Sequence, residues 1–418
     1  MTRSIGASLA HRNFRLFFAG QLVSLVGTWM QTVAQGWLVL TLTDDPFALG
    51  VVTACQFLPV LLFGLFGGVI ADALPKRQTL IVTQIVALIL ALTLGILVVT
   101  NLVQVWMIYL LAIVLGFVNA VEMPVRQSFV VEMVGRPDVA NAIALNSATF
   151  NLARIVGPAV AGLVIGLVGI AACFFLNASS FLAVLVAYLL MRDSELLPSP
   201  RIAVPRSVSA IATQLSEGLG YVRRTPTVRL AIVTLGVVAT AGMNFSVLVP
   251  VYAKDTLGGN ATTYGFLMAA TGVGSLTCAL MIAGGMRPTL RLLVGGAAVL
   301  GTSLITLALI KNELVALPVM LLLGWSVIAI AATTNTLIQM TVPDRLRGRV
   351  MSIYTTVFAG SSPIGGLIAG AIAAAAGVAA ALAVGGAVSI GAAALAGVRV
   401  RAMPSSQGGP RAASQGIG

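Results

Sequence analysis

The sequence predicts an all-α polytopic membrane protein with twelve transmembrane helices in two bundles of six. The composition is the first reason: 58% of the 418 residues are apolar and only 9% are charged, whereas about a quarter of an ordinary soluble domain is charged. The second reason is that the apolar residues form long stretches, and the third is that basic residues gather in alternate loops. This composition excludes a water-soluble globular protein and a disordered chain.

Each apolar stretch is long enough to cross a bilayer as a helix, which takes roughly 20 residues. Hydrocarbon offers no partner for backbone N–H and C=O groups, so these stretches must form helices. The sequence lacks the short alternating segments of a transmembrane β-barrel. The predicted spans are residues 14–40, 48–71, 79–99, 105–130, 141–166, 171–191, 228–253, 263–285, 290–310, 314–340, 350–375 and 378–398.

The basic residues predict the orientation of these spans. The chain has a net charge of +12, and 20 of its 24 Lys and Arg lie at the termini or in loops after even-numbered spans, whereas the other loops hold only Lys254 and Lys311. Since basic loops stay on the cytoplasmic side, we expect both termini in the cytoplasm and the chain in a bacterial cytoplasmic (inner) membrane. The charges are scattered between apolar runs, so we expect no nucleic-acid partner.

A long polar interval divides the spans into two sets of six. The halves also resemble each other weakly: Pro137 and Pro343 precede the fifth and eleventh spans, and each is followed about 20 residues later by a proline among glycines. Such a repeat is typical of duplicated transporter halves. The expected domains are an N-terminal bundle at 1–192, a cytoplasmic linker that could form an interfacial helix at 193–227, a C-terminal bundle at 228–398 and a disordered cytoplasmic tail at 399–418.

Four motifs carry a family resemblance. They are Gly68 to Arg77 (GVIADALPKR), Arg154 to Gly162 (RIVGPAVAG), Pro343 to Arg349 (PDRLRGR) and Arg12 to Phe17 (RNFRLF). On these motifs the chain resembles the major facilitator superfamily, within it the bacterial branch of macrolide and multidrug exporters and the enterobactin exporter. The resemblance covers nearly the whole chain, and it implies two bundles that rock about a central site.

The first and third motifs resemble cytoplasmic gating loops of that family. Asp72 lies near a helix end, where it can pair with a basic residue or a helix N-terminus and hold the halves together. Ala73 and Pro75 depart from the family pattern, which usually has a basic residue and a glycine there. A plain positive-inside loop and a cytoplasmic anchor are the alternative interpretations. The gating candidates are Asp72, Lys76, Arg77, Asp344, Arg347 and Arg349.

The second motif resembles the antiporter motif of exporters. Small residues let two helices touch, and Pro158 removes a backbone donor and can bend the helix. Generic helix packing is the alternative interpretation. The packing candidates are Gly157, Pro158 and Gly162.

Charges inside a membrane are costly and usually functional. Glu122, Arg126 and Arg154 lie within predicted spans, and the first two are four residues apart, on one helix face. One interpretation is a structural ion pair. The other is that Glu122 takes up and releases a proton, while Arg126 or Arg154 favours its charged form in one conformation. No arginine precedes Gly116, where many drug–proton antiporters have one, so a mechanism cannot simply be copied from them.

A polar stripe on the first span predicts a substrate cavity. Its members recur at steps of three and four, so they share one helix face; interhelical hydrogen bonding is the alternative interpretation. The resemblance implies that the first, fourth, seventh and tenth spans line the cavity. Such a pocket suits amphipathic or weakly cationic molecules better than highly charged anions. The cavity candidates are Gln21, Ser24, Thr28, Gln31, Gln35, Asn244, Trp325, Thr333 and Asn335.

Together these patterns predict secondary active transport, as proton-coupled efflux of hydrophobic or amphipathic small molecules such as a drug, macrolide or siderophore. An importer or a lipid or lysolipid transporter of the same fold is the alternative. A membrane-embedded enzyme would need clustered acid–base or metal-ligating residues, and the sequence offers none. No phosphate-binding loop occurs, so ATP is not expected. The expected partners are a small-molecule substrate, protons and the lipid bilayer, with no cofactor and no metal, and the chain is expected to be a monomer.

Overall fold

The computed structural model describes residues 6–197 and 208–402, without the side chains of 64–73 and 208–215. All regular secondary structure in this part of the chain is helical. The α-helices are α1 (Arg12–Thr43), α2 (Pro46–Ala73), α3 (Lys76–Val99), α4 (Val105–Leu167), α5 (Ile170–Leu189), α6 (Val208–Arg224), α7 (Pro226–Gly242), α8 (Phe245–Val251), α9 (Ala261–Ala283), α10 (Leu290–Leu309), α11 (Glu313–Thr341), α12 (Asp344–Ala376) and α13 (Val378–Ala402). Short 3₁₀ turns, η1 (Ala7–Ala10) and η2 (Asp193–Glu195), and one π-helical turn, η3 (Tyr252–Thr256), complete the described chain.

Eleven helical segments of the described chain are long and apolar enough to cross a membrane. One of them, α4, has 63 residues and contains two of the predicted spans, so the twelve-span prediction is confirmed. Gly135 has φ 69° and ψ 167°, which interrupts the helical geometry between the two spans. A positive φ is readily adopted only by glycine, and Pro137 follows two residues later. We call the parts before and after Gly135 the first and second segments of α4.

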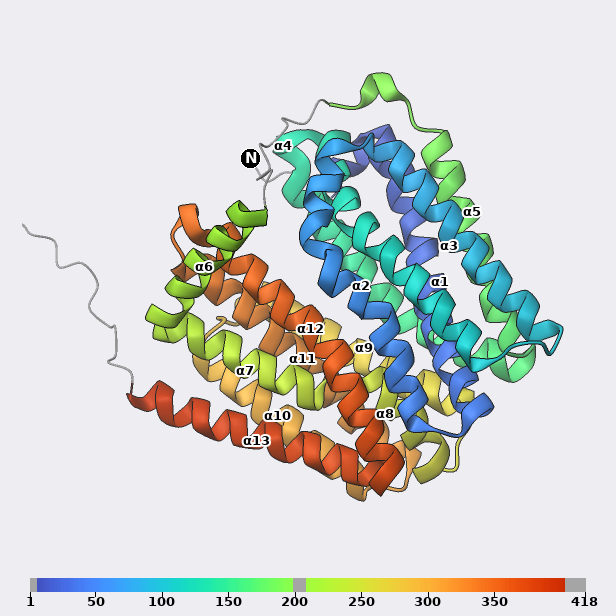
Figure 1. Ribbon diagram of the computed structural model, residues 1–418, viewed down its shortest axis with the longest axis vertical. Coiled ribbons are helices and arrows are strands. Elements are labelled where there is room, and N and C mark those ends of the chain that lie inside the picture. Colours follow the sequence, from blue (N-terminus) through green and yellow to red (C-terminus); the bar gives the residue numbers. More distant parts are fainter. Residues whose placement is uncertain (1–5, 198–207, 403–418) are drawn as a thin grey trace, which may run out of the picture.

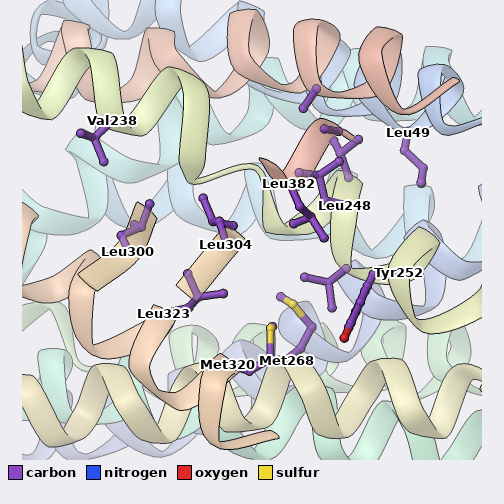
Figure 2. Packing of buried hydrophobic residues seen from close by; sticks show 14 of the residues in the cluster. Leu49, Val238, Leu248, Tyr252, Met268, Leu300, Leu304, Met320, Leu323 and Leu382 are labelled. Carbon is purple, nitrogen blue, oxygen red and sulfur yellow. The ribbon is translucent and has the colours of Figure 1, made fainter. Parts of the chain in front are cut away.

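The seventh predicted span is interrupted in the structure. It comprises α7, α8 and η3 and runs from Pro226 to Thr256. Met243 and Asn244 separate α7 from α8 with non-helical backbone angles. Buried side chains from α7, α8, α9, α10, α11 and α13 pack around this break (Figure 2). The labelled residues there are Leu49, Val238, Leu248, Tyr252, Met268, Leu300, Leu304, Met320, Leu323 and Leu382.

The helices form two bundles of six spans. In the N-terminal bundle α1 packs against α4 and α5, and in the C-terminal bundle α10 packs against α11 and α13. The two most extensive contacts between the bundles are those of α2 with α12 and of the second segment of α4 with α9. Many large apolar side chains face outward, including Leu167 (84% exposed) and Leu309 (78% exposed). Such an apolar exterior needs a nonpolar surrounding, so this is a multi-pass membrane protein.

Glycines bring the two bundles together near one end. A Cβ on Gly50 of α2 would lie 2.5 Å from the carbonyl oxygen of Gly366 in α12, and one on Gly265 of α9 would lie 2.5 Å from the carbonyl oxygen of Pro158. These contacts lie toward the end of the molecule where α1 finishes. The other end of the molecule, where α1 begins and α13 finishes, carries the arginine-rich loops, and we call it the basic end. We call the end where α1 finishes the opposite end. The bundles approach each other at the opposite end and diverge toward the basic end (Figure 1).

Candidate functional site

A buried polar cluster lies inside the N-terminal bundle, toward the basic end. We call Gln21, Gln84, Glu122, Arg126 and Tyr188 the Glu122 cluster; they come from α1, α3, α4 and α5. The Gln84 side-chain amide donates a hydrogen bond to Glu122 Oε1 at 3.2 Å, and Arg126 Nη1 lies 3.8 Å from the same oxygen. Arg126 Nη1 also donates to Gln21 Oε1 at 2.9 Å. The Tyr188 hydroxyl interacts electrostatically with Glu122 and Arg126.

The cluster keeps unused hydrogen-bonding capacity. Gln84 Oε1 is buried without a hydrogen-bond partner, whereas the Tyr188 hydroxyl interacts with the Gln21 side chain. Glu122 is 9% exposed, and the rings of Phe17 and Phe129 lie beside that of Tyr188. Since a glutamine side chain has both donor and acceptor atoms, Gln84 can donate to a charged Glu122 or, after rotation of its amide, accept from a protonated one. Gln84 therefore offers Glu122 both a hydrogen-bond donor and an acceptor.

Arg154 lies away from this cluster, in the second segment of α4. Its Nη2 donates to Asn151 Oδ1 at 3.2 Å, and its Nε is buried without a partner. The structure therefore brings Glu122 and Arg126 together and leaves Arg154 outside the cluster. Glu122, Arg126 and Arg154 all lie on α4, so a rocking of whole bundles does not by itself bring Arg154 to Glu122.

The gating candidates of the first motif lie within the N-terminal bundle. Lys76 Nζ donates to Glu132 Oε1 at 2.6 Å. Arg77 donates to the carbonyl oxygens of Tyr188 and Leu189 and pairs with Asp193 at 2.6 Å. Arg77 thus caps the C-terminal end of α5, whose last carbonyl groups have no helical partner. The Asp72 side chain lies outside the described residues.

The gating candidates of the third motif lie at the start of α12. Asp344 pairs with Arg347 at 2.5 Å, one turn away on the same helix. Arg349 pairs with Glu217, which attaches α6 to α12. These pairs, like those of Lys76 and Arg77, do not connect the two bundles.

The polar stripe of the first span is largely buried between helices. The Asn177 side chain on α5 donates to Gln31 Oε1 at 2.6 Å, and Gln21 accepts from Arg126. The Thr28 hydroxyl donates to the carbonyl oxygen of Ser24, and Gln35 is 9% exposed. For Gln21 and Gln31, these are the bonds that the second interpretation, interhelical hydrogen bonding, predicts.

The cavity candidates of the C-terminal bundle are scattered. Asn244 donates to the carbonyl oxygen of Thr240 at the α7–α8 break, beside Gly365 of α12. Trp325 Nε1 points to the sulfur of Met281 on α9 at 3.4 Å. Thr333 is fully buried, and its hydroxyl has no partner. Asn335 accepts from the Gln339 side chain at 2.5 Å.

The packing motif of the second segment of α4 faces both bundles. A Cβ on Gly157 would lie 2.5 Å from Trp29 Cβ in α1, whereas one on Gly162 would lie 2.9 Å from Thr262 Cα in α9. The Thr262 hydroxyl also donates to the Gly162 carbonyl oxygen at 2.9 Å. Pro158 meets α9 through its carbonyl oxygen, so this motif forms part of the seam between the bundles.

Sequence reasoning missed three polar partners. Gln84 bonds Glu122, Asn177 bonds Gln31, and Tyr188 joins the Glu122 cluster. Gln84 and Asn177 are polar residues inside otherwise apolar spans, and that signal could have marked them. The signal does not say which other helix each one faces.

Comparison with known proteins adds a family to this geometry. A family model described as "Transmembrane secretion effector" matches residues 3–415. The multidrug efflux pump Tap of Mycolicibacterium fortuitum is 28% identical over 376 residues, which cover 87% of this chain and 89% of the pump. The staphyloferrin A transporter of Staphylococcus aureus is 24% identical over 85% of this chain and 88% of its own length. The enterobactin exporter EntS of Escherichia coli is 25% identical over 87% of this chain and 86% of its own length.

Solved transporter structures share the fold. A bacterial homologue of the human lysosomal transporter Spinster, in an inward-facing and occupied conformation, matches with a TM-score of 0.74 and 13% identity over 95% of this chain and 98% of its own. The POT family transporter PepTSo matches with a TM-score of 0.74 and 15% identity over 94% and 98% of the two chains. At these identities the likeness concerns the fold alone.

Proposed function

Because this chain belongs to the transmembrane secretion effectors of the major facilitator superfamily, we propose that it exports hydrophobic or amphipathic small molecules in exchange for protons. The observation that carries the proposal is the seam between the bundles, which is tightly packed through glycines at one end and diverges toward the other (Figure 1). Two such bundles can open a central site to one side of a membrane at a time. Relatives named as a multidrug efflux pump and an enterobactin exporter support the export direction.

The excess of arginine at the basic end supports a cytoplasmic position for that end. Both termini then lie in the cytoplasm, and the protein acts in the bacterial cytoplasmic membrane as a monomer. In this orientation the described conformation is closed toward the outside and opens inward. The opposite end carries its own contact between bundles, the ion pair of Lys254 with Asp44 at 2.6 Å.

Closure of the basic end requires contacts that the described side chains do not make in this conformation. The basic groups of Lys76, Arg77 and Arg347 are paired within their own bundles. When the bundles approach, the first and third motifs meet across the seam, and Asp72 becomes the acidic group available to the basic residues of the third motif. The proposed gate is therefore the replacement of ion pairs within each bundle by ion pairs between the two bundles.

Glu122 is the proposed proton carrier. It is buried, its nearest donor is the neutral amide of Gln84, and Arg126 shares its guanidinium between Glu122 and Gln21. Energy for transport then comes from the proton gradient, without ATP and without a cofactor.

Transport into inside-out membrane vesicles with an acidic lumen tests this proposal. A panel of hydrophobic dyes, drugs and siderophores, with labelled lipid as a further arm, should include compounds that accumulate several-fold above vesicles without the protein. Accumulation should collapse when a protonophore is added. No accumulation of any compound, or accumulation that a protonophore leaves intact, would contradict proton-coupled export, and movement of lipid alone would favour the lipid transporter.

A further inference from the structure

Arg154 carries a charge that the described protein does not neutralise. Among the side chains that the structure describes, its one partner is the Asn151 amide oxygen on the same helix, and its Nε meets no acceptor. No carboxylate lies within 4 Å of its guanidinium among residues 6–197 and 208–402, apart from the undescribed side chains. It is 13 residues from the end of α4, about 20 Å at 1.5 Å per residue, and so lies deep within the membrane-spanning part.

Its neighbours on α4 fix the direction of its side chain. Gly157 packs against α1 of the N-terminal bundle, and Pro158 packs against α9 of the C-terminal bundle. On a helix, residues three and four positions away flank a given residue on the same face. Arg154 therefore projects between α1 and α9, along the seam of the two bundles, at the level where its own carbonyl oxygen still packs against Gly272 of α9.

Exposure along this face changes at Arg154. Toward the basic end, Ile143 and Phe150 share the face and are 56% and 44% exposed. Toward the opposite end, Gly157 and Pro158 are buried. Arg154 thus lies where the opening between the bundles ends. Phe150 contacts Trp29 edge-on, with ring centroids 5.7 Å apart, so an aromatic surface lies one turn away.

Among the described side chains, none of the acidic groups is placed to neutralise Arg154 when the basic end closes. The chain has 12 acidic residues. Those of the C-terminal bundle lie at its ends: Asp255 and Glu313 at the opposite end, and Asp344 at the basic end. Glu122 is held with Arg126 in the same bundle as Arg154. Closing the bundles over an unpaired guanidinium would remove its water, which is strongly unfavourable without a counter-charge.

We propose that the missing counter-charge is the substrate's own, and that Arg154 binds a carboxylate or sulfonate group of an amphipathic organic acid. The guanidinium offers a planar fork of donors that fits such a group, and the Phe150–Trp29 pair takes the apolar part. Binding then also permits closure of the basic end, because it removes the cost of burying the charge. This inference rests on the proposed export function and names its substrate class, and it adds a single anionic group to the amphipathic or weakly cationic molecules that the sequence leads us to expect.

Two matched probes test it on the full-length protein in nanodiscs at constant pH. The probes are 8-anilinonaphthalene-1-sulfonate and N-phenyl-1-naphthylamine, which share their aromatic part and differ in the sulfonate. Binding is measured by energy transfer from tryptophan, with empty nanodiscs subtracted. The wild type should bind the sulfonate at least tenfold more tightly than the neutral probe. Arg154→Gln should weaken sulfonate binding about tenfold and leave the neutral probe unchanged.

Arg154→Lys, which keeps the charge, should retain most of the preference for the sulfonate. Arg229→Gln removes an exposed arginine at the basic end and should leave both affinities unchanged. Equal affinity of the wild type for the two probes would overturn the inference. If Arg154→Gln and Arg154→Lys both weakened the binding of the two probes equally, Arg154 would have a packing role, and the inference would also be overturned. The binding assay uses no pH gradient, so its result does not depend on whether export is coupled to protons. Likewise, a failed binding assay would leave the proposal of proton-coupled export standing.

Discussion

Glu122 and Arg154 lie on the same helix, yet their surroundings differ. Glu122 is enclosed by polar groups from three other helices, so its charge is compensated inside one bundle. Arg154 faces the seam between the bundles, where its surroundings change when the bundles move. A proton site and a ligand site can therefore occupy the two spans of α4 without sharing a side chain.

Replacement of Glu122 by Gln removes the group that can exchange a proton but keeps its size. In the export proposal, Glu122→Gln should reduce pH-driven transport at least tenfold while substrate binding remains within about twofold. Uptake and equilibrium binding are measured on the same vesicles. Glu195→Gln, an exposed acid of η2, is the control. Normal pH-driven uptake in Glu122→Gln would show that another acidic residue carries the proton.

Gln31 has a structural role in the described conformation. Gln31→Ala leaves the Asn177 amide without its partner. An interhelical hydrogen bond in a membrane bundle is worth about 0.6 kcal/mol on average, and a buried unpaired donor costs about 1–3 kcal/mol. We expect the free energy of unfolding to fall by about 1–2 kcal/mol, with an unaltered substrate profile. Thr32→Ala, which removes a half-buried hydroxyl bonded only within α1, should change neither quantity. A changed substrate profile with an unchanged free energy of unfolding would instead support a role for Gln31 in the substrate cavity.

At the scale of helices, the seam depends on backbone contacts that only glycine permits. Gly50 and Gly366 bring α2 and α12 together, and Gly265 and Gly162 do the same for α9 and α4. Because no side chain intervenes, a small rotation of one bundle breaks the whole contact at once. This property suits a seal that must open and close.

Gly50→Leu should therefore weaken the seal at the opposite end. Its Cβ would lie 2.5 Å from the Gly366 carbonyl oxygen, and overpacking of this kind costs about 1–3 kcal/mol. A cysteine introduced by Thr53→Cys, after removal of the three native cysteines, should react faster with a water-soluble maleimide when Gly50→Leu is present. Gly391→Leu on α13, where a Cβ meets nothing within 4 Å, is the matched control. Equal reaction rates in both variants would show that this contact does not seal the protein.

The sequence predicts the spans well because apolar length decides whether a segment crosses a bilayer. It also indicates that 105–130 and 141–166 are separate spans, and Gly135 keeps them distinct within α4. The break between α7 and α8 directly follows Gly242, but Gly157 and other glycines lie inside unbroken helical segments, so a glycine alone does not predict a break. The partners of Gln21 and Gln31 depend on which helices are neighbours, and one sequence does not specify this.

At the scale of the whole molecule, the bundles have the arrangement that alternating access requires. They contact each other closely at the opposite end and diverge at the basic end. The proposed gate, the Glu122 cluster and Arg154 then lie in sequence from the basic end toward the packed seam. Rocking would close the basic end over the substrate and open the opposite end, with Arg154 remaining at the turning point.

Distances between spin labels at the two ends test this motion most directly. One pair joins Gln78 to Arg345 at the basic end, and the other joins Asn101 to Lys311 at the opposite end; all four positions are exposed. In a cysteine-free background, a change of pH or addition of a transported compound should shorten the first distance and lengthen the second together. Distances that stay fixed under every condition, or that change in the same direction at both ends, would contradict the rocking of two bundles about the seam.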